Sequence, residues 1–136
     1  MSALRRGNIW GMFSTFDAQA MVLAAGRGER MRPLTDFAPK PMLQVRGQPL
    51  MQWPMKALAR GGFVRQLVNT AWLGEQIPAH FGKRISWSGL PEVEIAYSPE
   101  GQDFGRALET AGGIVRALPQ FCLLYTSDAA DDLLCV

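Results

Sequence analysis

Short apolar runs alternate with amphipathic segments along most of the chain. Apolar runs of about five residues are typical of buried strands, and apolar residues three or four positions apart are typical of helices. The predicted strands cover residues 20–24, 42–45, 66–69, 93–97 and 121–125. The predicted helices cover residues 50–60, 73–81 and 110–118. Strands that alternate with helices at this spacing predict crossover units, and therefore an α/β fold with a mostly parallel sheet.

The beginning of the chain lacks this organisation. Residues 1–18 combine basic and apolar side chains without a helical or alternating period. They contain no apolar core of the length that a secretory signal peptide needs, so we do not expect secretion. The segment is expected to be a disordered leader that precedes the folded domain.

The composition narrows the class of protein. Of the 136 residues, 48% are hydrophobic and 19% are charged, which suits a globular domain with a core rather than a disordered chain. No run of about 18 apolar residues is present, so no membrane span is predicted. The two cysteines, Cys122 and Cys135, are too few for a disulfide framework or a four-cysteine zinc site, and the reducing cytoplasm is the expected location.

Positive charge is concentrated in the first part of the chain. Residues 1–60 hold nine Lys and Arg against three Asp and Glu, whereas residues 61–136 hold five against nine. A basic segment favours an anionic ligand, although basic residues also simply solvate a surface. Whether the basic residues bind a ligand or only solvate the surface depends on where the motifs lie.

A glycine-rich loop follows the first predicted strand. Gly26 and Gly28 permit positive φ angles and close approach of the backbone, so that successive N–H groups can surround phosphate oxygens. Arg30 adds a guanidinium for bidentate contacts, and Lys40 adds a charge between two prolines. The loop is therefore a candidate polyphosphate site. The alternative is a turn whose glycines serve only the backbone geometry.

Other residues have both a functional and a structural interpretation. Thr110 and Gly112 open a predicted helix, so their N–H groups either meet a ligand or form an ordinary helix start. Asn69 ends a predicted strand and either reaches the site or caps the next turn. Trp53 and Trp72 are expected in the core.

The glycine loop is part of a longer pattern. The residues LAAG-x-G-x-RM-x-PLT at positions 23–35, followed by PKPML at 39–43, resemble the signature of the sugar-1-phosphate nucleotidyltransferases. The stretches VNTAWLGEQI (68–77), YSPEG (97–101) and ALETAGGI (107–114) resemble one branch of that family in particular. This branch is the N-acetylmuramate-1-phosphate uridylyltransferases of bacterial peptidoglycan recycling.

The resemblance covers roughly residues 19–118 and implies both a fold and a reaction. The fold is a Rossmann-like, GT-A-like nucleotidyltransferase domain, truncated here after the fourth strand. The reaction joins a nucleoside triphosphate (UTP in this branch) to a sugar 1-phosphate (N-acetylmuramate 1-phosphate) and releases pyrophosphate with the help of Mg²⁺. Neither a nucleic acid nor a membrane is an expected partner. Guanine, thymine and hexose relatives share the glycine loop, and a regulatory nucleotide-binding domain or a fragment that does not fold are alternatives from other classes.

The family pattern also assigns roles to residues of this chain. Arg30 would steady the leaving pyrophosphate and Lys40 would neutralise phosphate charge, so these two are the expected catalytic residues. The segment that begins at Glu109 would face the base. The expected nucleotide-binding residues are Leu23, Ala24, Ala25, Gly26, Gly28, Glu29, Arg30, Lys40, Glu109, Thr110 and Gly112.

The metal site is the part of the family pattern that the sequence does not show. In the family an Asp after the fourth strand holds Mg²⁺, and no acidic residue before Leu118 stands at the end of a predicted buried strand. Asp128 is a candidate by position alone, and residues 122–136 resemble a translated sequencing-adapter tail. We therefore expect a leader (1–18), a nucleotide-binding part (19–121) and a non-native tail (122–136), and a chain without turnover.

Overall fold

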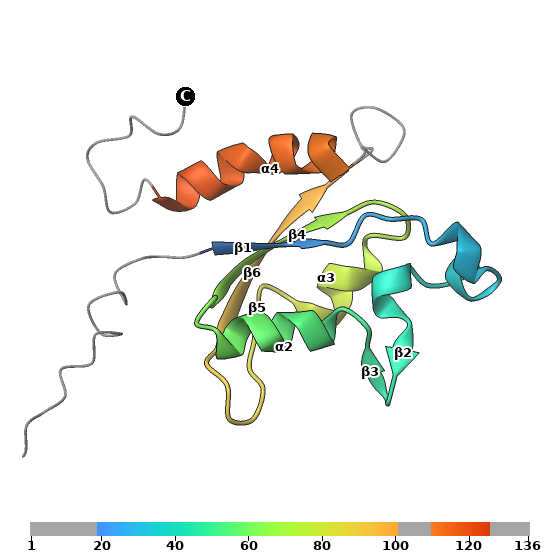
Figure 1. Cartoon of the computed structure of the whole chain (residues 1–136), viewed down its shortest axis with the longest axis horizontal. Helices are drawn as coiled ribbons and strands as arrows, with labels where there is room; N and C mark the ends of the chain where they lie inside the picture. The colour runs from blue at the N-terminus through green and yellow to red at the C-terminus, as the bar shows by residue number, and fades with distance from the viewer. Residues whose placement is uncertain (1–18, 101–109, 126–136) are drawn as a thin grey trace, which may run out of the picture.

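The computed structural model describes residues 19–100 and 110–125, with side chains up to residue 120. Its centre is a four-stranded sheet in the order β1 (Gln19–Leu23), β4 (Arg65–Thr70), β6 (Val93–Pro99) and β5 (Arg84–Ile85) (Figure 1). β1, β4 and β6 run parallel, and the short β5 pairs antiparallel with β6. The predicted α/β class with a mostly parallel sheet is confirmed.

The register brings the carboxyl ends of the three parallel strands to one edge of the sheet. Leu23 of β1 pairs with Asn69 of β4, and Asn69 pairs with Ser98 of β6. Along β6 the buried Val93 and Ile95 alternate with the exposed Glu94, which is the pattern expected of a strand packed mainly on one face. In open parallel sheets, ligands bind just outside the carboxyl ends of the strands.

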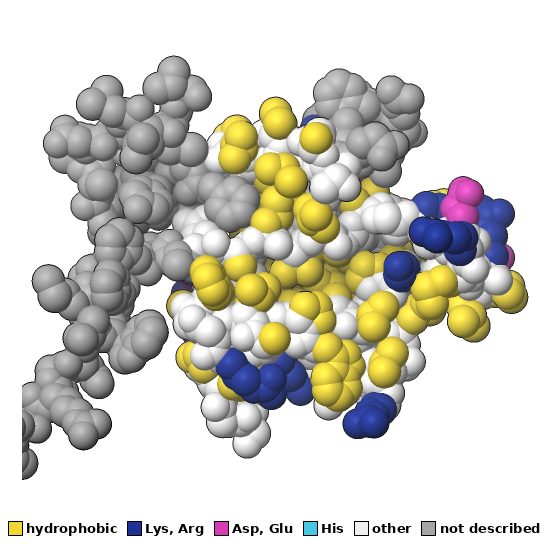
Figure 2. All heavy atoms as spheres, viewed as in Figure 1, with side chains coloured by type: hydrophobic (Ala, Val, Ile, Leu, Met, Phe, Trp, Pro, Cys, Tyr) yellow, Lys and Arg dark blue, Asp and Glu magenta, His cyan; other side chains and the backbone are white. Residues whose placement is uncertain are grey.

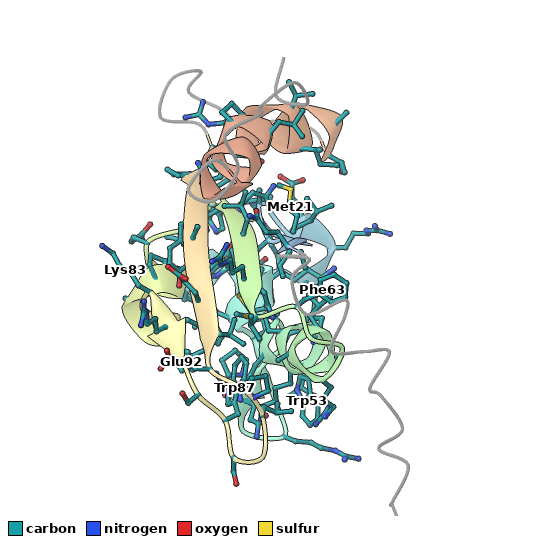
Figure 3. All side chains as sticks on the ribbon, turned by 90° about the vertical axis from the view of Figure 1, so that its left-hand side faces the viewer. Met21, Trp53, Phe63, Lys83, Trp87 and Glu92 are labelled. Atoms are coloured by element: carbon teal, nitrogen blue, oxygen red, sulfur yellow. The ribbon has the colours of Figure 1, made fainter. Side chains whose placement is uncertain are left out.

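Helices cover both faces of the sheet. α2 (Gln52–Arg60) and α3 (Gln76–Phe81) lie on one face, and α4 (Thr110–Tyr125) lies on the other (Figure 1). Figure 3 shows the same division, because Met21 lies towards α4 whereas Trp53 and Trp87 lie on the α2 side. The core under α2 and α3 is formed by Val22, Ala24, Met51, Met55, Ala59, Val68, Ile77, Phe81, Val93 and Ile95.

The sequence of α2 explains its length and its packing. Met55 and Ala59 are four residues apart, so both lie on the face that is buried against the sheet. The helix ends at Gly61, and Gly62 has a φ of +92°, a conformation that glycine adopts without strain. The predicted helix over 50–60 is confirmed to within two residues at its start.

The predicted strand over 42–45 is only partly correct. A 3₁₀ turn, η3 (Lys40–Met42), comes first, and β2 (Gln44–Val45) then pairs with β3 (Gln48–Pro49) in a separate hairpin rather than in the main sheet. Arg46 and Gly47 connect the two strands with φ angles of +52° and +74°. Two consecutive residues with positive φ form the type of tight turn that joins adjacent antiparallel strands.

The predicted strand over 121–125 is wrong, because these residues continue α4 to Tyr125. A five-residue apolar run fits a strand or the end of a buried helix, and periodicity alone does not separate the two. Pro119 lies inside the helix without ending it. In the part of the chain that the structure describes, no helix is both long enough and apolar enough to cross a membrane.

Candidate functional site

The glycine loop leaves β1 at the carboxyl edge of the sheet and folds back on itself. Gly28 has a φ of +67°, and a Cβ atom at this position would come within 3.0 Å of both the Lys40 Cβ and the Thr35 Cγ2. The fully buried Thr35 donates a hydrogen bond of 2.8 Å from its hydroxyl to the Gly28 carbonyl. Gly28 therefore allows Lys40 and Thr35 to approach the loop more closely than any larger residue would.

A pocket of about 380 Å³ lies between this loop, the end of β1 and the start of α2. Four predicted site residues, Leu23, Ala24, Gly26 and Lys40, are part of its wall. The other lining residues are Val22, Pro41, Leu50, Met51, Trp53 and Pro54. In Figure 2 the surface between α4 and α2 is largely apolar, and Lys and Arg side chains gather on the right, where the glycine loop lies. The site thus combines apolar walls with positive charge at one end.

Asn69 connects the ends of the three parallel strands. Its Oδ1 accepts a hydrogen bond of 2.6 Å from the Ala24 N–H, and its Nδ2 donates one of 2.6 Å to Oε1 of Glu100. Asn69 and Glu100 are 3% and 5% exposed, so both hydrogen bonds are shielded from water. A Cβ atom on Gly113 in α4 would collide with Glu100 and come within 2.9 Å of the Asn69 Nδ2. Asn69 therefore holds the backbone of Ala24, which lines the pocket, and that it belongs to the site stays a prediction.

Glu100 corrects one sequence-based expectation. It directly follows β6, so an acidic residue before Leu118 does stand at the end of a buried strand. The prediction ended this strand at residue 97 and therefore placed Glu100 in a loop. Its carboxylate accepts a hydrogen bond from the Asn69 side-chain amide, and such a donor stabilises the negative charge.

The four basic residues of the loop fall into two groups. Arg27 donates to the Thr35 carbonyl at 2.8 Å and forms an ion pair of 3.3 Å with Asp36, and Arg32 forms a second ion pair with the same carboxylate at 3.4 Å. Arg30 and Lys40 are exposed and have no ion pair within residues 19–100 and 110–120. The charges that remain available to a ligand are therefore the two that the sequence assigned to catalysis.

Two tryptophans predicted for the core lie at this site instead. Trp53 is 41% exposed and lines the pocket, and Trp72 is 39% exposed and packs against the glycine loop. The indole N–H of Trp72 donates to the Thr35 carbonyl at 2.9 Å, and the guanidinium carbon of Arg27 lies 3.8 Å from the centre of a Trp72 ring. Trp72 follows the carboxyl end of β4, and that position is the signal which could have indicated a site residue.

The remaining predicted residues do not line the pocket. Ala25 is buried, and Glu29 and Arg30 belong to the exposed turn η1 (Glu29–Met31). Thr110 and Gly112 lie in the first turn of α4, one residue before the contact of Gly113 with Asn69. Glu109 and Asp128 lie outside the described residues.

The described residues also bear on the expected magnesium site. Across residues 19–100 and 110–120, no group of three or more His, Cys, Asp or Glu side chains is arranged to hold a metal ion. The acidic side chain nearest to the strand ends, Glu100, is already hydrogen-bonded to Asn69.

A strand-end glycine loop, a neighbouring pocket and free basic residues define a nucleotide-binding α/β domain. The model of the nucleotidyl transferase family matches residues 19–132, and the chain belongs to that family. Both the predicted family and the predicted enzyme class are thus confirmed.

Similar proteins agree with this assignment. The chain is 52% identical over 119 residues to the N-acetylmuramate alpha-1-phosphate uridylyltransferase of Neisseria meningitidis serogroup B, covering 85% of this chain and 48% of the relative. It is 40% identical over 103 residues to a UTP–glucose-1-phosphate uridylyltransferase of Synechocystis, covering 71% of this chain and 25% of that protein. The chain thus spans less than half the length of either relative.

A solved structure supports the fold. The crystal structure of UDP-glucose pyrophosphorylase complexed with UDP-glucose matches with a TM-score of 0.60 and 18% identity, over 75% of this chain and 40% of that chain. At this identity the match shows a shared fold. The described sheet and helices thus have the fold of that protein, in agreement with the α/β fold that the sequence predicts.

Proposed function

We propose that the chain provides the nucleotide-binding part of a uridylyltransferase that transfers UMP from UTP to a sugar 1-phosphate. A phosphate oxygen of the sugar 1-phosphate attacks the α-phosphorus of UTP and forms the new P–O bond. The bond between the α-phosphorus and the bridging oxygen breaks, and pyrophosphate leaves. The observation that carries the proposal is the position of Lys40, which lies against Gly28 of the glycine loop, lines the pocket and has no ion pair among the described residues.

The geometry suits a nucleoside triphosphate. The pocket volume of about 380 Å³ lies within the range typical of small-molecule sites. Its apolar wall, including Trp53 and Leu50, provides contact area for a base and a ribose. Lys40 and Arg30 provide positive charge that stabilises the triphosphate and the leaving pyrophosphate. In-line transfer at phosphorus requires mainly such positioning and charge stabilisation.

The names of the relatives support uracil as the base. The Neisseria and Synechocystis proteins are both named uridylyltransferases, and the higher identity belongs to the one that acts on N-acetylmuramate 1-phosphate. We therefore propose N-acetylmuramate 1-phosphate as the acceptor, within peptidoglycan recycling in the bacterial cytoplasm. A relative named mannose-1-phosphate guanylyltransferase is 36% identical over 101 residues, so guanine with mannose 1-phosphate is the pair to exclude first.

Mg²⁺ is proposed as the ion that accompanies the triphosphate. When bound there, it would withdraw charge from the phosphate oxygens. The described part of the chain holds no carboxylate cluster for it. Arg30 and Lys40 contribute the positive charge that this part of the chain supplies.

Calorimetric titration of the chain with UTP in the presence of Mg²⁺ tests the proposal. Lys40→Ala is expected to weaken binding by about tenfold or more, because one charge-assisted hydrogen bond contributes about 1.5–3 kcal/mol. Lys83→Ala is the matched control, since Lys83 is an exposed lysine well separated from Trp53 (Figure 3). Equal affinity of the wild type and Lys40→Ala, or no binding of UTP by the wild type, would contradict the proposal.

A further inference from the structure

The end of β4 and the residues directly after it contact the glycine loop at both ends of the loop. At the start of the loop, the Asn69 Oδ1 accepts a hydrogen bond from the Ala24 N–H. At the far end, the Trp72 indole N–H donates to the Thr35 carbonyl. Residues 69–72 thus bracket the part of the loop that carries Gly26, Gly28 and Arg30.

Arg27 completes the attachment at the far end. Its guanidinium donates to the same Thr35 carbonyl at 2.8 Å and lies over the Trp72 ring, with 3.8 Å between the guanidinium carbon and the ring centre. The cation–π contact and the two hydrogen bonds to one carbonyl hold Arg27, Trp72 and Thr35 in a fixed arrangement. Arg27 is therefore engaged within the protein, although it stands between the two glycines of the loop.

This attachment is connected to Lys40 through direct contacts. The Thr35 hydroxyl donates to the Gly28 carbonyl, and the position of a Gly28 Cβ would be 3.0 Å from both the Thr35 Cγ2 and the Lys40 Cβ. Thr35 is thus bonded to Gly28, and the missing Cβ of Gly28 leaves room for both Thr35 and Lys40 to pack closely against the loop. Arg27 and Trp72 thus act on the site through Thr35.

We propose that Arg27 and Trp72 are positioning residues that hold the glycine loop in the conformation that binds the triphosphate. The proposal rests on the proposed function, because it describes the same site. A loop that is already ordered does not lose its conformational entropy when the ligand binds. Since both side chains lie at the surface rather than in the core, their removal should loosen the loop while the sheet and its helices stay folded.

Three variants test the proposal by hydrogen exchange and calorimetry. In Arg27→Gln and Trp72→Leu, the amides of Met31 and Asp36, which donate to Gly28 and Pro33, are expected to exchange faster in the absence of nucleotide. UTP affinity is expected to fall by about tenfold at a nearly unchanged melting temperature. Arg27→Lys separates a positioning role from phosphate binding. Its UTP affinity should be as low as that of Arg27→Gln, because lysine lacks the planar guanidinium that reaches Thr35 and stacks on the indole.

The outcomes distinguish this proposal from the proposed function. Unchanged exchange of the loop amides in both Arg27→Gln and Trp72→Leu would overturn the positioning role. Recovery of UTP affinity in Arg27→Lys would also overturn it, because it would show that Arg27 acts through its charge as a phosphate ligand. Absence of UTP binding to the wild type would instead overturn the proposed function, and the exchange measurement would still decide whether Arg27 and Trp72 order the loop. Arg60→Gln, which changes an exposed arginine at the end of α2, is the matched control and should behave as the wild type in both measurements.

Discussion

The core under α2 and α3 and the carboxyl edge of the sheet are built from different interactions. In the core, Met55, Val68 and Ile77 are fully buried and contribute apolar volume. At the edge, the buried Thr35 and Asn69 are polar, and each is held by hydrogen bonds to the backbone of the glycine loop. The core therefore depends on how well space is filled, and the edge depends on particular donor and acceptor atoms. Changes in the core should act on stability, and changes at the edge should act mainly on nucleotide binding.

The largest effect on stability is expected in the core. Met55→Ala removes a fully buried side chain and leaves a cavity under α2, which should lower the free energy of unfolding by about 2–5 kcal/mol. Urea denaturation followed by circular dichroism measures the change. Ala57→Ser, at an exposed position of the same helix, should cost less than about 0.7 kcal/mol. Equal losses for the two variants would contradict the packing assigned to α2.

Asn69 is expected to affect both stability and binding. Asn69→Ala leaves the buried Ala24 N–H without its acceptor and the Glu100 carboxylate without one donor, which should cost about 1–3 kcal/mol of stability. Asn69→Asp should be worse at neutral pH, because it would place a second carboxylate beside that of Glu100. Part of the loss in Asn69→Asp should be recovered as the pH falls and one carboxylate becomes protonated. Melting curves at neutral and acidic pH measure this, and an Asn69→Asp variant as stable as the wild type at pH 7 would contradict the hydrogen-bond arrangement.

Gly28 should show the smaller stability cost and the clearer binding defect. A Cβ atom there would meet Lys40 and Thr35 at 3.0 Å in a backbone conformation with φ of +67°. Gly28→Ala is expected to cost about 1–2 kcal/mol of stability and to weaken UTP binding by more than this loss explains. Gly62→Ala, also at positive φ but with no atom within 4 Å of its Cβ position, is the matched control for backbone strain. If both variants bind UTP equally well, the close approach at Gly28 has no role in the site.

The smallest effect concerns the side of the sheet formed by β6 and β5. The Tyr97 hydroxyl donates to the Gly82 carbonyl at 2.5 Å, and burial raises the pKa of this phenol from 10.0 to about 12. Because the folded-state pKa is the higher one, the stabilisation is fully present below pH 10 and is lost as the pH rises from 10 to 12. Tyr97→Phe should cost about 1 kcal/mol at pH 7 and should lose less further stability over that alkaline range than the wild type. Parallel stability curves in alkali for the two proteins would contradict this assignment.

The parts of the molecule with strong local patterns could be predicted from the sequence. The apolar and alternating patterns of β1, β4 and β6 predicted the three parallel strands. The motif of the glycine loop and Lys40 lies in one short stretch of the chain, so local sequence was enough to predict a candidate site there, and Gly26 and Lys40 do line one pocket. The end of β6 was predicted two residues early, which concealed Glu100. Helix and strand could not be separated for residues 121–125, since a short apolar run satisfies both.

Contacts between distant residues were the part that could not be predicted. Trp72 and Thr35 are far apart in sequence, as are Asn69 and Glu100. The local pattern of apolar and polar residues does not show that such residues form pairs. The sequence does not distinguish a tryptophan that packs on a surface loop from one that fills a core, so Trp53 and Trp72 were wrongly assigned to the core. The role of Arg27 within the protein could not be predicted either, because its partners Asp36 and Trp72 are brought to it only by folding.

The central claim is that the glycine loop and Lys40 bind the triphosphate of UTP. Addition of UTP with Mg²⁺ to the ¹⁵N-labelled chain, followed by amide NMR spectra, tests this most directly. The account predicts that the largest shifts occur at the amides from Leu23 to Arg30 and at Lys40, while Gly82 and Arg84, on the β5 side of the sheet, remain unchanged. Shifts that are absent from the loop, or that are largest at Gly82 and Arg84, would contradict it.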